Sequence, residues 1–212
     1  AGAVPYLAAS SPSWNDIALT AEERWTTLAE RHPDLQPAVE LQRSLLAIVF
    51  DIAQKLERHP LPRLSLPPKY LAAKLLRGVP ALAGEPIPLP AAALKGGLLR
   101  FCAALQAGGA GEVAGHIGSA LETGSMDAGS LLTACLSRDQ AAVRTGATHM
   151  DLAPDLVWLV GELGVGPLAH LLQRSLFTTN AGTPLGDALA AWNQGYCPAC
   201  GSWAAMAEVV DA

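Results

Sequence analysis

Two cysteines near the end of the chain form the most specific chemical pattern in this sequence. They lie in the stretch Tyr196-Cys-Pro-Ala-Cys-Gly-Ser202, a Cys-Pro-x-Cys-Gly turn. Cys197 and Cys200 can supply two thiolates to one tetrahedral metal ion, while Pro198 stiffens the loop and Gly201 permits a turn after the second ligand. A closed structural site takes four ligands, so we expect half a metal site at this turn.

The Cys-x-x-Cys spacing alone is compatible with three kinds of site. Thioredoxin-like redox pairs share it, and such cysteines can also be inert or disulfide-linked. The flanking Pro, Gly and Ser are typical of a knuckle in a zinc ribbon or a rubredoxin-like site. A redox pair normally opens a helix after a strand of a βαβ unit, and the sequence indicates no such unit. The pattern favours a metal knuckle, with the other two kinds of site as alternatives.

No other residues in the sequence complete this site at a recognisable spacing. Cys102 and Cys135 lie in apolar helical patterns, where buried free thiols are common. Two alternatives supply the missing ligands: a second cysteine pair beyond the end of this chain, or a second copy of the chain in a homodimer that shares one site.

Catalysis has weak support in the sequence. His116, and His149 with Asp151, are candidate catalytic groups by residue type, but the histidines are isolated in helical patterns. The sequence has no Gly-x-Ser-x-Gly elbow, no His-Glu-x-x-His and no paired carboxylate motif. We therefore expect a protein that is not an enzyme.

Composition predicts a soluble helical protein. Half of the 212 residues are hydrophobic, with only 5% aromatic residues and abundant Ala and Leu, which favours helix over sheet. A net charge of −5 gives no basic surface for nucleic acid or for anionic lipid. The longest apolar run, 152–165, is interrupted by Pro154, Asp155 and Glu162, so we expect no membrane insertion. With no signal peptide indicated at residues 1–13, we expect a cytoplasmic protein with reduced thiols.

Apolar residues recur at three- and four-residue steps along most of the chain, which predicts a mostly α fold. Capping-box patterns occur at Thr20–Glu23 and Ser137–Gln140, and a pause or kink is expected at Gly164–Pro167. The expected helices cover approximately 21–31, 35–58, 68–77, 91–107, 111–121, 127–136, 138–148, 154–164 with a continuation to 177, and 185–193.

These elements suggest three segments. We expect a helical domain at 1–177, a joint with a short helix at 178–195, and the first knuckle of a rubredoxin-like or zinc-ribbon module at 196–212. Turn-forming residues over Thr178–Gly186 predict a flexible joint, which would place the cysteine turn on a movable arm.

Four stretches carry a resemblance to a known family. The segment Trp192-Asn-Gln-Gly-Tyr-Cys-Pro-Ala-Cys-Gly-Ser202 resembles the first cysteine knuckle of the bacterial formate dehydrogenase accessory (formation) proteins. Looser similarities to the helical part of that family are found upstream, in Arg24–Pro33, in Leu136–Gln140 followed by Ala153–Trp158, and in Leu168–Leu172.

The resemblance implies a function and a partner. Proteins of that family have a helical N-terminal domain followed by rubredoxin-like modules with several Cys-x-x-Cys pairs that bind iron or zinc. They are cytoplasmic, are not known as enzymes, and assist maturation by binding the catalytic subunit of formate dehydrogenase. The resemblance assigns Cys197 and Cys200 as the first ligand pair. This sequence has no later pair, so we expect it to lack the later cysteine-rich modules.

Overall fold

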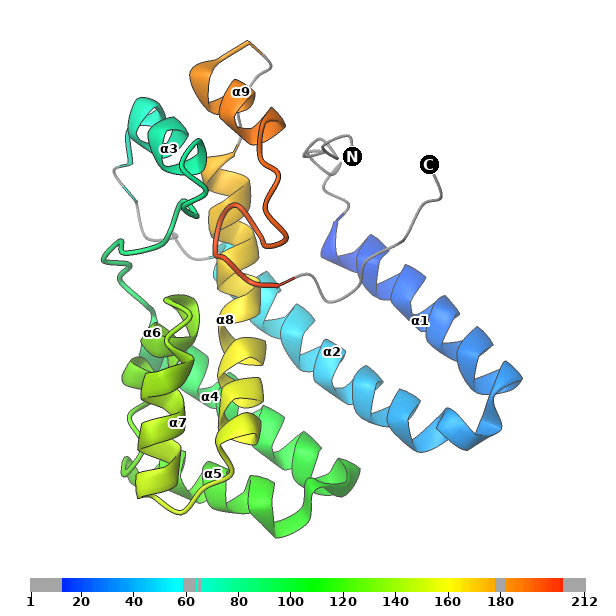
Figure 1. Ribbon diagram of the computed structural model, residues 1–212. Coiled ribbons are helices and arrows are strands. Elements are labelled where there is room, and N and C mark those ends of the chain that lie inside the picture. The colour runs from blue at the N-terminus through cyan, green and yellow to red at the C-terminus, as the bar shows by residue number, and fades with distance from the viewer. Residues whose placement is uncertain (1–12, 59–63, 65, 178–181, 204–212) are drawn as a thin grey trace. The chain divides into compact units, whose positions relative to one another are not determined.

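The computed structural model describes residues 13–58, 64, 66–177 and 182–203, and these are mostly helical (Figure 1). The predicted mostly α class is confirmed. Extended pairing in this part of the chain is limited to an isolated antiparallel bridge between Tyr196 and Trp203. The helices are α1 Trp14–Arg31, α2 Gln36–Arg58, α3 Pro68–Leu75, α4 Ala91–Leu105, α5 Gly111–Thr123, α6 Ala128–Leu136, α7 Gln140–His149, α8 Pro154–Leu176 and α9 Pro184–Ala190, with a 3-10 turn η1 at Pro33–Leu35 and a π turn η2 at Gln106–Ala110.

Side-chain caps set two helix starts at residues other than those expected. The capping box that opens α1 is formed by Ser13, whose hydroxyl accepts a hydrogen bond from the Asp16 N–H, and by the Asp16 carboxylate, which accepts from the Ser13 N–H. The predicted start at Thr20–Glu23 was therefore wrong. At α7 the cap is Asp139, which accepts from the Ala142 N–H, and not Ser137. The Ser13 hydroxyl and the Asp139 carboxylate each hold a first-turn N–H that otherwise has no partner in the helix.

Helix α8 passes through Gly164–Pro167 without a break, so the predicted pause was wrong. Burial explains the continuity, since Val165 and Leu168 are fully buried beside the proline. The glycine at 164 serves packing, because a Cβ there would lie 2.5 Å from a methyl carbon of Leu98. Helix α8 is longer than the apolar run 152–165 noted in the sequence, and by length and composition alone it could cross a membrane. However, 56% of its most apolar 18-residue window is buried inside the protein, as in a core helix.

The described residues group into two compact units, each with its own apolar core. The helical unit comprises the described residues of Ser10–Pro62 and Pro88–Leu171. The cysteine unit comprises those of Arg63–Ile87 and Leu172–Ala212. The division at residues 177 and 195 expected from the sequence groups the chain differently and stays a prediction.

Close backbone approaches build the core of the helical unit. A Cβ at Gly97 of α4 would meet Ile52 of α2 at 2.5 Å, and a Cβ at Gly161 of α8 would overlap the Cys135 sulfur of α6. Helix α1 lies along α2 and has no fully buried residue. Its first residue, Trp14, stacks edge-on against His170, with ring centroids 5.1 Å apart.

Candidate functional site

The cysteine turn is a tight hairpin closed by its own backbone. The Cys197 N–H donates to the Ser202 carbonyl at 2.8 Å, and the Gly201 N–H donates to the Cys197 carbonyl at 2.9 Å. Gly201 has a φ of +74°, in the left-handed region that only glycine adopts without strain. The Tyr196–Trp203 bridge closes the hairpin at its open end. The turn therefore holds both thiols on one short loop.

Polar groups lie close to both sulfurs of the turn. The backbone N–H groups of Ala199 and Cys200 donate to the Cys197 sulfur, and both stabilise its thiolate form. The Ser202 hydroxyl lies 3.2 Å from the Cys200 sulfur. Donors placed in this way around thiolate ligands are the outer-shell partners that orient a metal site and tune it.

The neighbouring thiol and burial both disfavour the thiolate form of Cys197. The pKa of Cys197 is raised well above its ordinary value, first by its hydrogen bond with the Cys200 thiol and then by burial. Cys200 is 9% exposed and Cys197 is partly buried. Metal ligands must be thiolates, so metal binding by Cys197 would be coupled to release of its proton.

Three hydrogen bonds fix the turn to the loop that follows α3. The N–H groups of Ala81 and Leu82 donate to the carbonyls of Pro198 and Ala199 at 2.8 and 2.9 Å. The Tyr196 hydroxyl donates to the Gly78 carbonyl at 2.7 Å. Residues 196–203 are thus part of a packed unit, and the expectation of a movable arm was wrong for them. Residues 178–181 of the expected joint lie outside the described residues.

The cysteine turn packs against an apolar core. Trp192 is buried, donates its indole N–H to the Tyr196 carbonyl at 3.0 Å, and packs edge-on against the Tyr196 ring. Trp203, the other tryptophan beside the turn, is 79% exposed and contacts the same ring from outside. The buried members of this core are Leu71, Ala72, Leu75, Ala81, Phe177, Leu185, Ala188, Leu189, Trp192 and Ala199.

A buried lysine shapes the loop on which the turn rests. Lys74 of α3 is only 3% exposed, and its ammonium group donates to the carbonyls of Ala81 and Ala83 and to the Glu85 carboxylate, at 2.9, 2.6 and 2.7 Å. These three bonds use all three of its N–H donors. Lys74 positions the backbone from which Ala81 and its neighbour donate to the cysteine turn.

The sequence pattern does not single out Lys74. The available signal was a lysine three residues after Leu71 and next to Leu75, on the apolar face of α3. A lysine at such a place usually extends its charged end into water, and only the fold shows that carbonyls receive it instead.

The other expected thiols are buried and free, as predicted for a helical interior. Burial raises the pKa of Cys102 to about 11 and that of Cys135, beside Glu162, to about 12. Both belong to the helical unit.

The histidines considered for catalysis are not gathered into a cluster with acids or cysteines. His116 lies in α5 and His149 ends α7, two residues before Asp151, which has a φ of +55°. Within the described ranges, no group of three or more His, Cys, Asp and Glu side chains could hold a metal ion. The cysteine turn therefore fits half of an iron or zinc site, and a four-coordinate ion there needs ligands from a second chain or from residues outside those described.

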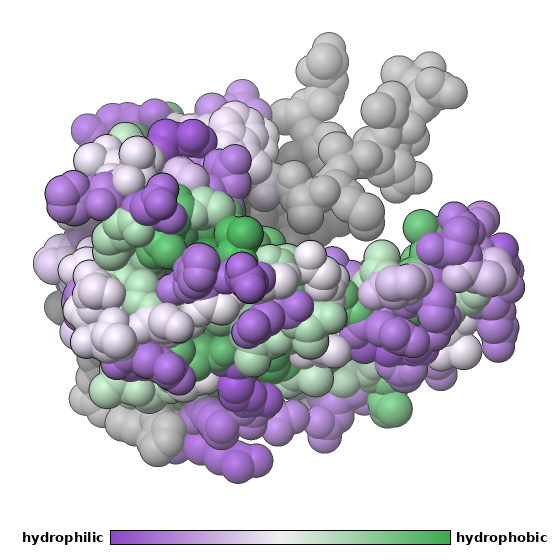
Figure 2. Space-filling view, turned by 90° about the horizontal axis from the view of Figure 1, so that it is seen from below, coloured by the Kyte–Doolittle hydropathy of each residue, from purple (hydrophilic) through white to green (hydrophobic). Residues whose placement is uncertain are grey.

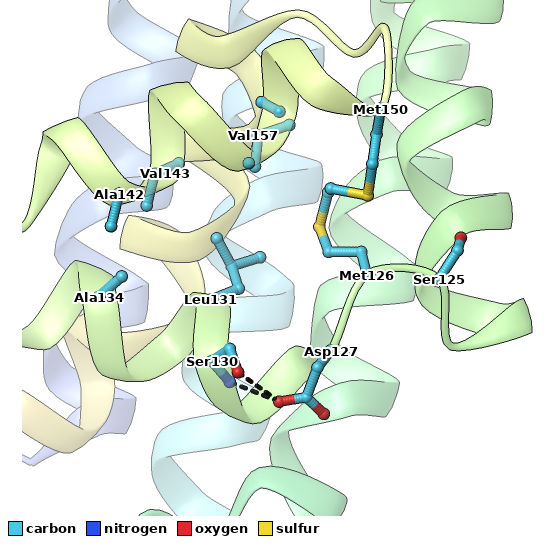
Figure 3. A pocket seen from close by; sticks show the side chains of 12 residues that line it. Ser125, Met126, Asp127, Ser130, Leu131, Ala134, Ala142, Val143, Met150 and Val157 are labelled. Atoms are coloured by element: carbon cyan, nitrogen blue, oxygen red, sulfur yellow. Dashed lines mark hydrogen bonds between the residues drawn. The ribbon is translucent and has the colours of Figure 1, made fainter.

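A separate apolar pocket of about 330 Å³ lies between α6, α7 and the start of α8 (Figure 3). Met126 and Met150 meet on one side of it, and Leu131 and Val157 line its interior. At its edge Asp127 caps α6, because its carboxylate accepts hydrogen bonds from the N–H and hydroxyl of Ser130. On the face seen in Figure 2, hydrophobic side chains reach the surface in several places between hydrophilic ones.

No protein-family model matches this chain, and neither a curated protein nor a solved structure does.

Proposed function

We propose that this chain is a non-enzymatic, cytoplasmic accessory protein that binds the catalytic subunit of formate dehydrogenase and assists its maturation. The support is the resemblance of Trp192–Ser202 to the first knuckle of the formate dehydrogenase accessory proteins. In the same proposal, residues 196–203 are the first knuckle of a rubredoxin-like or zinc-ribbon site.

The structural observation that supports the knuckle is the set of donors around the cysteine pair. Backbone N–H groups of Ala199 and Cys200 donate to the Cys197 sulfur, and the turn is anchored on a buried base. A metal knuckle needs this preorganisation, because its ligands must present charged sulfurs to one point. The metal, when bound, supplies structural cross-linking; this chain's own residues orient the sulfurs and exclude water from one side.

Metal content tests the knuckle. Elemental analysis combined with intact mass of the purified chain should find zinc or iron that is lost in a Cys197→Ser/Cys200→Ser variant. One ion per two chains would indicate a site shared by a homodimer. A Cys102→Ala/Cys135→Ala variant is the matched control and should keep its metal. Metal content equal in all three proteins would contradict the knuckle.

Client binding tests the accessory function. Tagged chain should retain purified formate dehydrogenase catalytic subunit in a pull-down and should not retain an unrelated molybdoenzyme subunit of similar size. Retention of both subunits alike, or of neither, would count against the proposed partner. Because the readout is binding and not metal content, failure of this test leaves the metal test separate.

A second candidate function is metal delivery or thiol redox chemistry by the same pair. The observation that favours it is that no third His, Cys, Asp or Glu side chain joins the two cysteines among the described residues. An ion bound by this pair would therefore keep open coordination positions. An insulin-reduction assay separates the redox version: the wild-type chain should show no more activity than the Cys197→Ser/Cys200→Ser variant. A clear excess of activity in the wild type would favour redox chemistry over the knuckle.

A further inference from the structure

A second cavity, distinct from the cysteine unit, lies in the helical unit between α2 and α4. Its volume is about 360 Å³. Ile52, Leu56 and Leu94, all buried, form its apolar lining. Lys55 and Arg100 stand at the same cavity with Asp51. The cavity thus combines an apolar interior with charged side chains.

The charges at this cavity leave an excess of one positive charge. Lys55 donates to Oδ2 of Asp51 at 2.9 Å, and Arg100 donates to the same oxygen. The two cations lower the pKa of Asp51, Lys55 contributing more than Arg100, so its carboxylate stays ionised. Two cations therefore share one carboxylate. Lys55 uses one of its N–H groups for this bond, and Arg100 uses one of its own. The remaining donors are open to an anion, since both side chains are about half exposed or more.

Gly96 lines the cavity, and no packing contact requires a glycine at that position. Gly97 is explained by its close approach to Ile52, but its neighbour Gly96 also lies in the interior of α4. A Cβ at Gly96 would meet no atom within 4 Å, although the residue lines the cavity. Glycine inside a helix lowers stability relative to alanine. Neither helix propensity nor packing therefore favours glycine at position 96.

We propose that this cavity binds a small organic anion, a carboxylate with a short apolar chain. The carboxylate pairs with Arg100 and Lys55, since a guanidinium group can bind both oxygens of a carboxylate at once. The apolar chain lies on Ile52, Leu56 and Leu94. The proposal is independent of the accessory function and of the cysteine turn.

Titration of the whole chain with butanoate tests this proposal, followed by ¹⁵N–¹H NMR shifts of the α2 and α4 amides. We expect saturable shifts with a midpoint in the millimolar range. Acetate should bind about tenfold more weakly, because it lacks two methylene groups that the cavity would bury. Inorganic phosphate, an anion without an apolar part, should also bind more weakly than butanoate. Shifts that do not saturate, or phosphate binding as well as butanoate, would overturn the proposal.

Two variants locate the site. Gly96→Leu places a side chain in the cavity without meeting protein atoms at its Cβ and should abolish butanoate binding, whereas Gly96→Ala should fold at least as stably as the wild type and weaken binding less. Arg100→Gln should weaken binding at least tenfold, and Arg100→Lys should restore part of it. Arg144→Gln, which removes an exposed ion pair with Asp155, is the control and should bind as the wild type does. Unchanged binding in folded Gly96→Leu, or in Arg100→Gln, would place the anion elsewhere and reject the site.

Discussion

At the scale of single residues, the four cysteines divide into two chemical classes. Cys197 and Cys200 lie on one loop, where backbone N–H groups approach the sulfur of the first. Cys102 and Cys135 are 2% and 0% exposed in helix interiors and act as small apolar side chains. Their environments predict different behaviour with pH.

The thiol of Cys197 should react slowly in metal-free protein. Its pKa is raised by the Cys200 thiol and by burial, so little thiolate exists at pH 7.5. We expect iodoacetamide to modify it at least tenfold more slowly than cysteine in the urea-unfolded chain, and the rate to keep rising above pH 9. Mass spectrometry of time points measures this. A rate that levels off below pH 7 would mean a lowered pKa and would argue for a redox thiol.

Stability should fall at alkaline pH because of Cys102 and Cys135. Their folded pKa values of about 11 and about 12 lie above the unfolded value, so both states are protonated below about pH 8 and nothing is lost there. As pH rises above 9, the unfolded thiols ionise and the folded ones do not, which favours unfolding. We expect a loss of roughly 1.5–2 kcal/mol per thiol by pH 10.

Urea unfolding at pH 7 and pH 10 measures that loss. Tyrosine and lysine titration also contributes at pH 10, so the Cys102→Ala/Cys135→Ala variant is the reference. Its change in unfolding free energy between the two pH values should be about 3–4 kcal/mol smaller than that of the wild type. Equal changes in the two proteins would show that the buried thiols do not titrate as described.

At the scale of elements, α3 and the loop after it form the base of the cysteine turn. The Lys74 ammonium group pairs with the Glu85 carboxylate near the end of that loop and donates hydrogen bonds to two of the loop's carbonyls. The pair is buried, with side chains 4% and 12% exposed. Lys74 lowers the pKa of Glu85, and Tyr70 adds a smaller effect. Removal of one partner from such a pair leaves the other charge without compensation.

Replacement of Lys74 by Met should destabilise the cysteine unit by about 3–5 kcal/mol, because Glu85 loses its cationic partner and two carbonyls lose their donor. Urea unfolding followed by Trp fluorescence measures the change. The double variant Lys74→Met/Glu85→Gln should be more stable than Lys74→Met alone, since no unpaired charge remains. Lys55→Met, which removes an exposed lysine 63% accessible to solvent, is the control and should change stability by less than about 1 kcal/mol.

The packing of α8 on α6 depends on a residue with no side chain. A Cβ at Gly161 would overlap the Cys135 sulfur, so Gly161→Ala should destabilise the protein by roughly 1–3 kcal/mol. Gly146→Ala in α7 is the matched control, because its Cβ would meet open space. That variant should gain up to about 1 kcal/mol from helix propensity. Thermal unfolding of both variants checks the difference, and equal effects would contradict the close approach.

At the scale of the whole molecule, two cores are built from interrupted stretches of sequence. The cysteine unit joins α3 and its loop with α9 and the cysteine turn, more than a hundred positions apart in the chain. The helical unit is likewise formed from two stretches. Each core excludes water by itself, so a destabilising substitution in one core should lower the local stability of that unit most.

Hydrogen exchange of the two destabilised variants tests this. Lys74→Met should speed amide exchange at least tenfold in 66–77 and 184–192, with a smaller effect in 94–105 and 131–136. Gly161→Ala should show the reverse pattern. Mass spectrometry of peptides from these segments gives the rates. Equal acceleration throughout the chain in both variants would show that the two cores unfold as one.

The sequence by itself determined the helical class and most helix ends. Apolar spacing located α2, α4 and α6 closely, because a helix buries one face and its periodicity is local. The N-cap of α1 was missed because two competing boxes, at Ser13 and at Thr20, are equally acceptable locally. The sequence also placed Cys197 and Cys200 in one turn, since their spacing is short.

Only the tertiary structure decided what surrounds that turn. The hydrogen bonds from Ala81 and Leu82 and the buried ion pair of Lys74 join residues far apart in the chain, and no local pattern encodes such pairing. The same holds for Gly161, whose glycine is required by the sulfur of Cys135 on another helix. Local periodicity and caps follow from the backbone of each segment, whereas burial, close approach and the partners of a charge depend on which segments the fold brings together.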